Sequence, residues 1–157
     1  MTEIRGTFDA RGRRFAVAAA RFNEIVTSKL VDGALACFRA HSVSEDDVLV
    51  VWVPGAFELP LAAQRLAATG LYDGVVCLGA VIRGETPHFD IVAGECAGGL
   101  RDVALRTGVP VGFGVLTTGD MGQALSRAGG KHGNKGWDAA AAAMEMASVL
   151  DQVPSKD

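Results

Sequence analysis

The fold is decided by residues 78–89, which read LGAVIRGETPHF and join the end of an apolar run to the start of a helix. The run from Gly74 to Val81 is continuous, as in a strand that is covered on both faces. After a short turn, Thr86 suits a helix cap and Pro87 suits the first helical position, because its missing N–H is not needed there. A strand that leads at once into a helix is the repeating unit of a parallel α/β sheet.

The same turn has the chemistry of an anion-binding site. Backbone N–H groups at a helix start lack partners within the helix and lie at the positive end of its dipole. Gly84, Glu85 and Thr86 present such groups, and phosphate is the ligand that they favour. His88 follows, and its imidazole exchanges protons near neutral pH, although an ordinary surface histidine also fits this position. The turn indicates chemistry on a small phosphorylated substrate.

Apolar runs alternate with helical patterns along the whole chain. The predicted strands are Phe15–Ala20, Val48–Val53, Gly74–Val81 and Val109–Leu116. The helical stripes are Leu30–Phe38, Leu59–Leu66, Phe89–Val103, Met121–Ala128 and the Ala-rich stretch Trp137–Leu150. This alternation predicts an α/β fold, a single-domain three-layer sandwich with a flavodoxin-like four-stranded parallel sheet and helices on both faces.

The ends of the chain stand outside this alternation, although we assign all of residues 1–157 to one domain. Residues 1–12 are expected to be an N-terminal extension, in which Ile4–Phe8 forms either an extra edge strand or a strand that pairs with another subunit. Residues 151–157 are expected to be a flexible tail. Gly94, Gly98 and Gly99 lie inside a helical pattern at a cost of about 1 kcal/mol each, so close packing of another helix or subunit is expected there.

Composition and charge exclude several classes of protein. The chain has 157 residues, of which 49% are apolar, and a formal net charge of −3, so neither nucleic acid nor a membrane surface is an expected partner. No apolar run can span a bilayer and the start lacks a secretory signal, so we expect a cytoplasmic protein. Cys37, Cys77 and Cys96 lack metal-site spacing and are expected to be reduced core residues; no metal is predicted.

A ligand site is expected at the carboxyl ends of the strands. Phe22 follows the first strand as either a core aromatic or a stacking face for a planar ligand. Glu58 follows the second strand, as either a first-turn carboxylate stabilised by the helix dipole or an acceptor for a polyol or amine. Arg127 lies on the polar face of its helix, as either a solvated side chain or a bidentate partner of phosphate.

The glycine-rich segment 129–136, GGKHGNKG, is not a nucleotide-binding loop. That motif needs Gly at Asn134 and Ser or Thr at Gly136, and it follows a strand, whereas this segment follows a predicted helix. We expect its glycines to end one helix and to turn sharply into the next. His41 and His132 are expected on the surface.

Together these segments resemble the lumazine synthase family nearly from end to end. The motifs that carry the resemblance are ARFN (20–23), VPGAFELP (53–60), LGAVIRG (78–84), TPHF (86–89), GVLTT (114–118), RAG (127–129) and GNKG (133–136). The resemblance implies a transferase of riboflavin biosynthesis that condenses 5-amino-6-(D-ribitylamino)uracil with 3,4-dihydroxy-2-butanone 4-phosphate. The product is 6,7-dimethyl-8-ribityllumazine, phosphate and water are released, and no cofactor is implied.

The resemblance also implies a role for each candidate residue. Phe22 would stack on the pyrimidine, Glu58 would hold its ribityl chain, and His88 would be the catalytic residue that shuttles protons. The other pyrimidine-binding positions are Ala56, Phe57, Ala80, Val81, Ile82 and, from the neighbouring subunit, Phe113. The butanone phosphate would be bound by Gly84, Glu85, Thr86, Arg127 and Lys135. At Glu85 we expect only the backbone N–H to be used, because a carboxylate repels phosphate.

The family builds pentamers with active sites between neighbouring subunits, and in many members pentamers close into an icosahedral shell. The uninterrupted turn at 129–136 resembles that of shell-forming members, so we expect a homo-oligomer of this kind, with riboflavin synthase as a candidate partner inside it. Three alternatives are a flavin- or lumazine-binding module without catalysis, a shell protein with a decayed site, and a flavodoxin-like electron carrier. The first needs neither Arg127 nor His88, and the last needs a phosphate loop where this chain has Arg21-Phe22-Asn23-Glu24.

Overall fold

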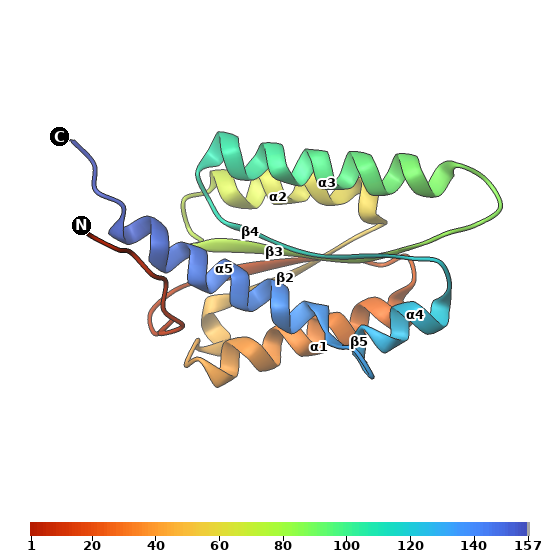
Figure 1. Ribbon diagram of the computed structural model, residues 1–157, viewed down its shortest axis with the longest axis horizontal. Helices are drawn as coiled ribbons and strands as arrows, with labels where there is room; N and C mark the ends of the chain where they lie inside the picture. Colours follow the sequence, from red (N-terminus) through yellow and green to blue (C-terminus); the bar gives the residue numbers. More distant parts are fainter. Residues whose placement is uncertain (157) are drawn as a thin grey trace.

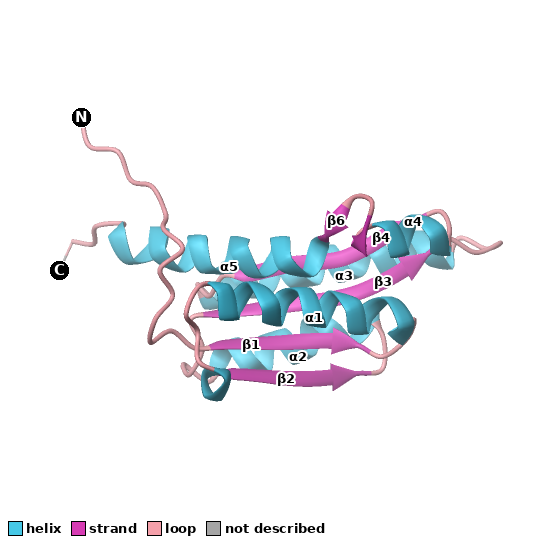
Figure 2. Cartoon of the chain, turned by 90° about the horizontal axis from the view of Figure 1, so that it is seen from below, coloured by secondary structure: helices cyan, strands magenta, loops and turns pink. Residues whose placement is uncertain are grey.

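The central sheet has four parallel strands in the order β2-β1-β3-β4 in the computed structural model, which describes residues 1–156. The strands are β1 (Phe15–Ala20), β2 (Val48–Val53), β3 (Gly74–Ile82) and β4 (Val111–Thr118). All four run in the same direction, so their carboxyl ends share one edge of the sheet (Figure 2). The order and direction are those of a flavodoxin-like sheet, and they confirm the predicted fold class.

Helices cover both faces of the sheet and give the molecule three layers (Figure 1). One layer contains α1 (Glu24–Ala40), α4 (Met121–Ser126) and α5 (Lys135–Gln152), and the other contains α2 (Leu59–Ala68) and α3 (His88–Thr107). Two single-turn helices, η1 (Glu45–Asp47) and η2 (Ala56–Glu58), flank β2. Among residues 1–156, none of the helices has the length and apolarity that a membrane crossing requires.

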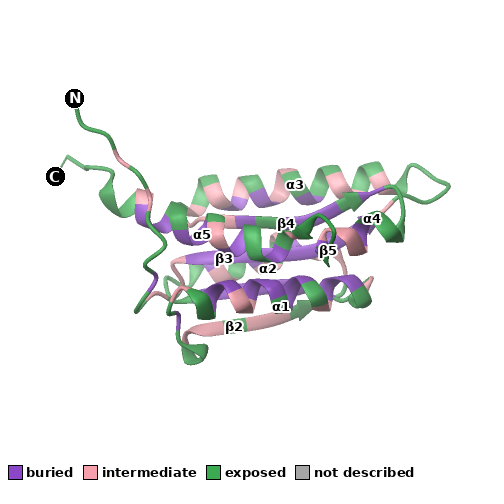
Figure 3. Cartoon of the chain, turned by 60° about the horizontal axis from the view of Figure 1, so that its bottom comes forward, coloured by how far each residue is buried: buried purple, intermediate pink, exposed green. Residues whose placement is uncertain are grey.

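Strand β1 separates two hydrophobic cores, one under each helical layer. Alternate residues from Phe15 to Ala19 point towards α1 and α5, and those from Ala16 to Ala20 point towards α2 and α3. Every side chain of β1 is buried, which explains why the strand reads as a continuous apolar run. In Figure 3 the buried residues of α1 form a stripe along the helix, whereas β2, at the sheet edge, is mostly half-buried.

The fourth strand starts and ends later than predicted. Its expected range was Val109–Leu116, but the ladder with β3 runs from Val111 to Thr118. Pro110 has no N–H to donate to a ladder, so it contributes only its carbonyl, which accepts from the Val75 N–H at 2.9 Å. The shift carries Thr117 and Thr118 into the strand, beside the end of β3.

The start of α3 also differs from the prediction. Thr86 does not cap the helix; Pro87 is the capping residue, and His88 is the first helical residue. Pro87 has ψ of 5°, outside the helical range, and its carbonyl accepts from the N–H of Asp90 and of Ile91. The turn at residues 83–87 therefore lies wholly outside the helix as a loop.

A small hairpin replaces the predicted end of the fourth helix. The stripe Met121–Ala128 is helical only to Ser126, and β5 (Ala128–Gly130) and β6 (Gly133–Asn134) then pair antiparallel. Gly129 and Gly133 have φ of 103° and 79°, which glycine adopts readily. The prediction of a glycine-dependent turn at this place is confirmed, but the turn contains two short strands.

Asn134 attaches this hairpin to α1 and α5. Its side-chain oxygen accepts from the N–H of Gly136 at 2.8 Å and of Trp137 at 3.1 Å, and so caps α5. Its amide nitrogen donates to the Lys29 carbonyl in α1 at 3.0 Å. One side chain thereby fixes the hairpin relative to both helices.

The N-terminal residues pack on α5 and form no strand in their own chain. Thr7 bonds to Ser148 through its N–H at 3.1 Å, and Gln152 donates to the Arg5 carbonyl at 2.9 Å. Ile4–Phe8 therefore adds no edge strand to its own sheet. At the other end, α5 extends to Gln152, so the segment 151–157 starts within the helix; Asp157 lies outside the described residues.

The helical glycines serve different purposes. A Cβ at Gly99 would lie 2.7–2.8 Å from ring carbons of Pro60, so Gly99 allows α3 to approach α2, as predicted for close helix packing. A Cβ at Gly94 would meet nothing within 4 Å. Gly136 is the tightest case, because its Cβ would overlap the backbone carbonyl of Leu30 in α1.

These contacts predict opposite effects for two Gly→Ala substitutions. Gly136→Ala is expected to lower the free energy of unfolding by about 1–3 kcal/mol, because backbone atoms cannot move aside cheaply. The matched Gly94→Ala should raise it by about 0.5–1 kcal/mol through helix propensity. Thermal unfolding of both variants is the measurement. A neutral Gly136→Ala would contradict the close α1–α5 contact, and a loss at Gly94 would instead reveal a second copy packed on α3.

Candidate active site

A cavity of about 730 Å³ opens beyond the carboxyl ends of the strands, on the side of α2 and α3. It is lined by Phe22, Pro54, Gly55, Ala56, Phe57, Glu58, Ala80, Val81, Ile82, Gly84, Thr86, His88, Phe89, Ile91 and Val92. This volume is typical of small-molecule sites. The lining contains ten of the predicted site residues and comes from the exits of β1, β2 and β3 together with the start of α3.

Phe22 forms one wall of the cavity. Its backbone N–H donates to the Pro54 carbonyl at 3.0 Å, and the N–H of Arg21 donates to the Val53 carbonyl at 2.7 Å, so the exits of β1 and β2 are joined. The residue is nevertheless 72% exposed. The core interpretation of Phe22 is therefore wrong, and a ring that lines a cavity while exposed is available for stacking on a ligand.

Glu58 also lines the cavity. It is the last residue of η2 and directly precedes α2, yet its side chain makes no capping hydrogen bond to that helix. Its Oε1 lies 3.3 Å from the position that a Cβ on Gly55 would occupy, so the carboxylate lies over the Gly55 backbone. Glu58 lies at the start of α2, where the helix dipole acts on it, and its carboxylate is free to accept hydrogen bonds from a ligand.

The loop at residues 83–87, drawn in green at the right of Figure 1, is fixed at both ends. The Arg83 N–H donates to the Thr118 carbonyl at 2.9 Å. The Arg83 guanidinium lies 4.4 Å from the centre of the Phe89 ring and 3.4 Å from Asp90 Oδ1, beyond the loop. A single residue thus ties the loop to the exit of β4 and to the first turn of α3.

Within this loop the backbone is available for an anion. In the described part of the chain, no group accepts a hydrogen bond from the N–H of Gly84, Glu85 or Thr86. The loop also precedes α3, so the positive end of the helix dipole lies nearby. Gly84 and Thr86 line the cavity, whereas Glu85 does not. The arrangement provides donors for a phosphate with the Glu85 carboxylate outside the cavity.

Four predicted site residues do not reach the cavity of their own chain. Arg127 and Lys135 belong to the α1/α5 layer, on the other face of the sheet, where Arg127 Nη1 donates to the Gln123 carbonyl at 3.0 Å. Phe113 flanks the C-terminal half of α3, away from the first turn that lines the cavity. Glu85 is the fourth. The cavity in one chain therefore contains donors for a phosphate but no Lys or Arg side chain among its lining residues.

Sequence reasoning missed five lining residues, Pro54, Gly55, Phe89, Ile91 and Val92. Phe89 and Val92 belong to the predicted apolar stripe of α3, and they do pack against the core. The first turn of α3 serves both the core and the cavity, because it lies where the sheet ends. For Phe89, Ile91 and Val92, the position shortly after the anion-binding turn is the signal that points to the cavity, and for Pro54 and Gly55 it is the position directly after β2.

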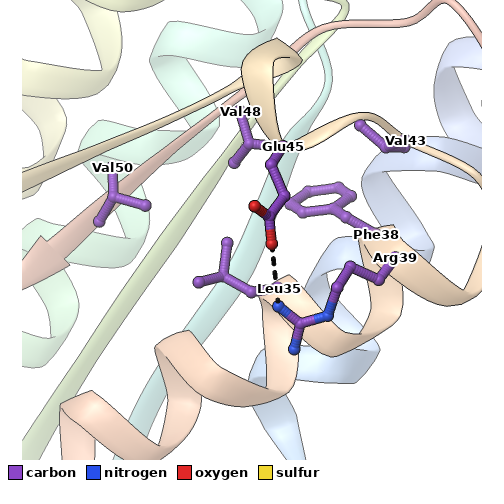
Figure 4. A pocket seen from close by; sticks show the side chains of 7 residues that line it. All are labelled: Leu35, Phe38, Arg39, Val43, Glu45, Val48 and Val50. Atoms are coloured by element: carbon purple, nitrogen blue, oxygen red, sulfur yellow. Dashed lines mark ion pairs between the residues drawn. The ribbon is translucent and has the colours of Figure 1, made fainter.

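A second hollow, of about 180 Å³, lies near the beginning of β2 (Figure 4). It is lined by Leu35, Phe38, Arg39, Val43, Glu45, Val48 and Val50. Its charged groups are one ion pair, in which Arg39 Nη1 and Glu45 Oε1 lie 3.8 Å apart. The remaining lining is aliphatic or aromatic, so apart from this ion pair the hollow offers no polar side chain and no histidine.

The three cysteines are free and buried, as predicted. Burial raises the pKa of the Cys37 thiol to about 11, with a smaller contribution from Asp138, and burial raises the pKa of Cys96 to about 11. The pKa of Cys77 is raised further, chiefly by burial. All three are neutral thiols near pH 7. Across residues 1–156, no three His, Cys, Asp or Glu side chains gather as a metal site.

Comparison with known proteins identifies the family. The sequence profile of the 6,7-dimethyl-8-ribityllumazine synthase family matches residues 12–151. The chain belongs to this family. A 6,7-dimethyl-8-ribityllumazine synthase from Nitratidesulfovibrio vulgaris is 52% identical over 150 residues, which cover 96% of each chain. The lumazine synthase resemblance of the motifs is thereby confirmed, and the electron-carrier alternative is wrong.

The thiols provide a test of the packing of the two cores, because Cys37 belongs to one and Cys77 and Cys96 belong to the other. At pH 8, Ellman's reagent is expected to modify none of Cys37, Cys77 and Cys96 in the folded protein, because each thiol is buried and protonated. Unfolding in guanidinium should release all three. Rapid modification of any thiol in the native protein would contradict the burial described here.

Proposed function

We propose that the cavity at the strand ends is where this member of the lumazine synthase family condenses 5-amino-6-(D-ribitylamino)uracil with 3,4-dihydroxy-2-butanone 4-phosphate. The product is 6,7-dimethyl-8-ribityllumazine, with release of phosphate and water. One observation carries the proposal: free loop N–H groups, the exposed Phe22 ring and His88 line the same cavity. These are the groups that a phosphate, a planar pyrimidine and a proton transfer require.

The pyrimidine occupies the side of the cavity formed by β1, β2 and β3. Phe22 stacks on its ring, a contact worth about 0.5–1.5 kcal/mol beyond area burial. Ala80, Val81 and Ile82 offer backbone groups at the β3 exit, and Ala56 and Phe57 do so in η2. Glu58 accepts hydrogen bonds from the ribityl hydroxyls, a role supported by its lack of a capping bond.

The butanone phosphate occupies the side formed by the loop before α3. The N–H groups of Gly84, Glu85 and Thr86 bind its phosphate, supported by the helix dipole. The same donors stabilise the phosphate as it leaves. His88, the first residue of α3, gives and takes protons as the 5-amino group attacks the ketone and as phosphate is lost.

Most of the acceleration comes from holding the two substrates together. Proximity and orientation supply about 7–11 kcal/mol in well-aligned reactions. A positioned acid–base group such as His88 adds about 10²–10⁴-fold. The cavity supports a larger share for proximity than for acid–base catalysis, because its lining is mostly apolar and His88 is its one histidine.

A second copy of the chain completes the site. Phe113, Arg127 and Lys135 are assigned to the site by family resemblance but lie outside the cavity of their own chain. We propose that a neighbouring subunit supplies them, Arg127 as the cation that pairs with the substrate phosphate. This places the active site between subunits of a pentamer.

Two further features support assembly. Ile4–Phe8 is unpaired in its own chain, and β2 is an apolar edge strand whose Trp52 is 41% exposed, so we propose that Ile4–Phe8 pairs with another subunit. The short hairpin at 129–136 supports an icosahedral shell of pentamers.

We further propose a cytoplasmic location, one domain over residues 1–157, and riboflavin synthase as an enclosed partner.

Mixing the purified protein with both substrates and following lumazine absorbance tests the activity. Arg127→Ala is expected to raise the KM for the butanone phosphate about 10–100-fold, because a charge-assisted contact to phosphate is lost, with little change in the KM for the pyrimidine. A wild-type protein that binds flavin tightly but gives no acceleration would favour the binding module instead.

Glu85→Ala is the matched control in the loop. Its KM for the butanone phosphate should stay within about twofold of wild type, since only its backbone N–H is used. A large gain in affinity for that substrate would show that the carboxylate faces the phosphate, and would contradict the proposed loop geometry.

A further inference from the structure

Asn23 has an unusual backbone conformation at the edge of the cavity. Its φ of 64° and ψ of 44° are left-handed, and among residues 1–156 the only other non-glycine residue with positive φ is Ser42. Such conformations are uncommon outside glycine and often belong to functional sites. Asn23 directly follows Phe22 and directly precedes α1.

The Asn23 side chain does not make the bond that its position suggests. Asparagine is a preferred helix cap, but here its side chain makes no capping bond to α1. The backbone carbonyl caps instead, accepting from the N–H of Val26 at 2.9 Å and of Thr27 at 3.1 Å. The side chain is therefore free for another partner.

That partner is the backbone carbonyl of Ala80, a residue that lines the cavity. Asn23 Nδ2 donates to the Ala80 carbonyl at 2.8 Å, across 57 positions of sequence. The pairing of β1 with β3 ends at Ala19 and Leu78, so β1 no longer accompanies β3 at Ala80. The Asn23 amide bonds to β3 beyond the end of the β1–β3 ladder.

We propose that Asn23 is a positioning residue for the pyrimidine subsite. Its left-handed turn sets the direction in which Phe22 leaves β1, and its amide fixes the Ala80 carbonyl, so one residue sets two walls of the subsite. The phosphate loop is held separately, by Arg83 and Thr118. The inference rests on the proposed function, and it predicts that Asn23 affects pyrimidine binding but not phosphate binding.

Three substitutions separate the turn from the amide. Asn23→Gly keeps the left-handed turn without strain but loses the bond to Ala80. Asn23→Asp keeps the size and the tolerance for this conformation, but its carboxylate cannot donate to a carbonyl. Asn23→Ala loses both features and is expected to have the lowest thermal midpoint. Ser42→Gly is the control, since Ser42 has the same conformation (φ 67°) just beyond the far end of α1.

The measurements are the KM for each substrate, kcat, and the Kd of the lumazine product by equilibrium dialysis. Asn23→Gly and Asn23→Asp should raise the pyrimidine KM and the product Kd about 3–10-fold, as expected for one lost hydrogen bond. The KM for the butanone phosphate should stay within about twofold, because its loop has independent anchors. Ser42→Gly should leave all of these values unchanged.

The proposal is overturned if Asn23→Gly and Asn23→Asp leave the pyrimidine KM and product Kd at wild-type values. It is also overturned if both KM values rise together, which is the result of a general structural role. Equilibrium dialysis measures binding of the product at the pyrimidine subsite, and it does not require turnover. A wild-type protein that binds the product but forms none therefore refutes the proposed reaction, while the Asn23 variants still decide this inference.

Discussion

The site depends on β3 running past the end of β1. The two strands pair only as far as Ala19 and Leu78, whereas β3 and β4 stay paired to Ile82 and Thr118. The last residues of β3, after Leu78, therefore pair with a strand on one side only. On their other side the chain diverges at Phe22, and the cavity opens in that space.

The two-sided packing of the sheet divides the proposed site residues. The cavity and the phosphate loop lie with α2 and α3, whereas Arg127 and Lys135 lie with α1 and α5 on the other face. In one chain, these two sets of residues therefore lie on opposite faces of the sheet. If Arg127 acts on the phosphate as proposed, a second copy of the chain supplies it.

Sequence reasoning succeeded where the signal was local. Continuous apolar runs located the strands, and the strand ends located Phe22, Glu58 and His88. It failed at the start of α3, where Pro87 and not Thr86 is the capping residue, and in β4, where Pro110 delays the ladder. The bond from Asn23 to Ala80 has no local signal at all, because only the finished sheet brings the two residues together.

Mixed assembly tests the central claim, that neighbouring chains share each active site. His88→Ala and Arg127→Ala chains are unfolded together and reassembled in equal amounts. Lumazine formation is measured at a butanone phosphate concentration well below the KM of Arg127→Ala, where each variant alone is weak. If a neighbour supplies Arg127, random mixing should restore about a quarter of the wild-type sites, since each site then needs one intact group from each of two chains. If activity stays at the level of the separate variants, both groups act within one chain and the account is contradicted.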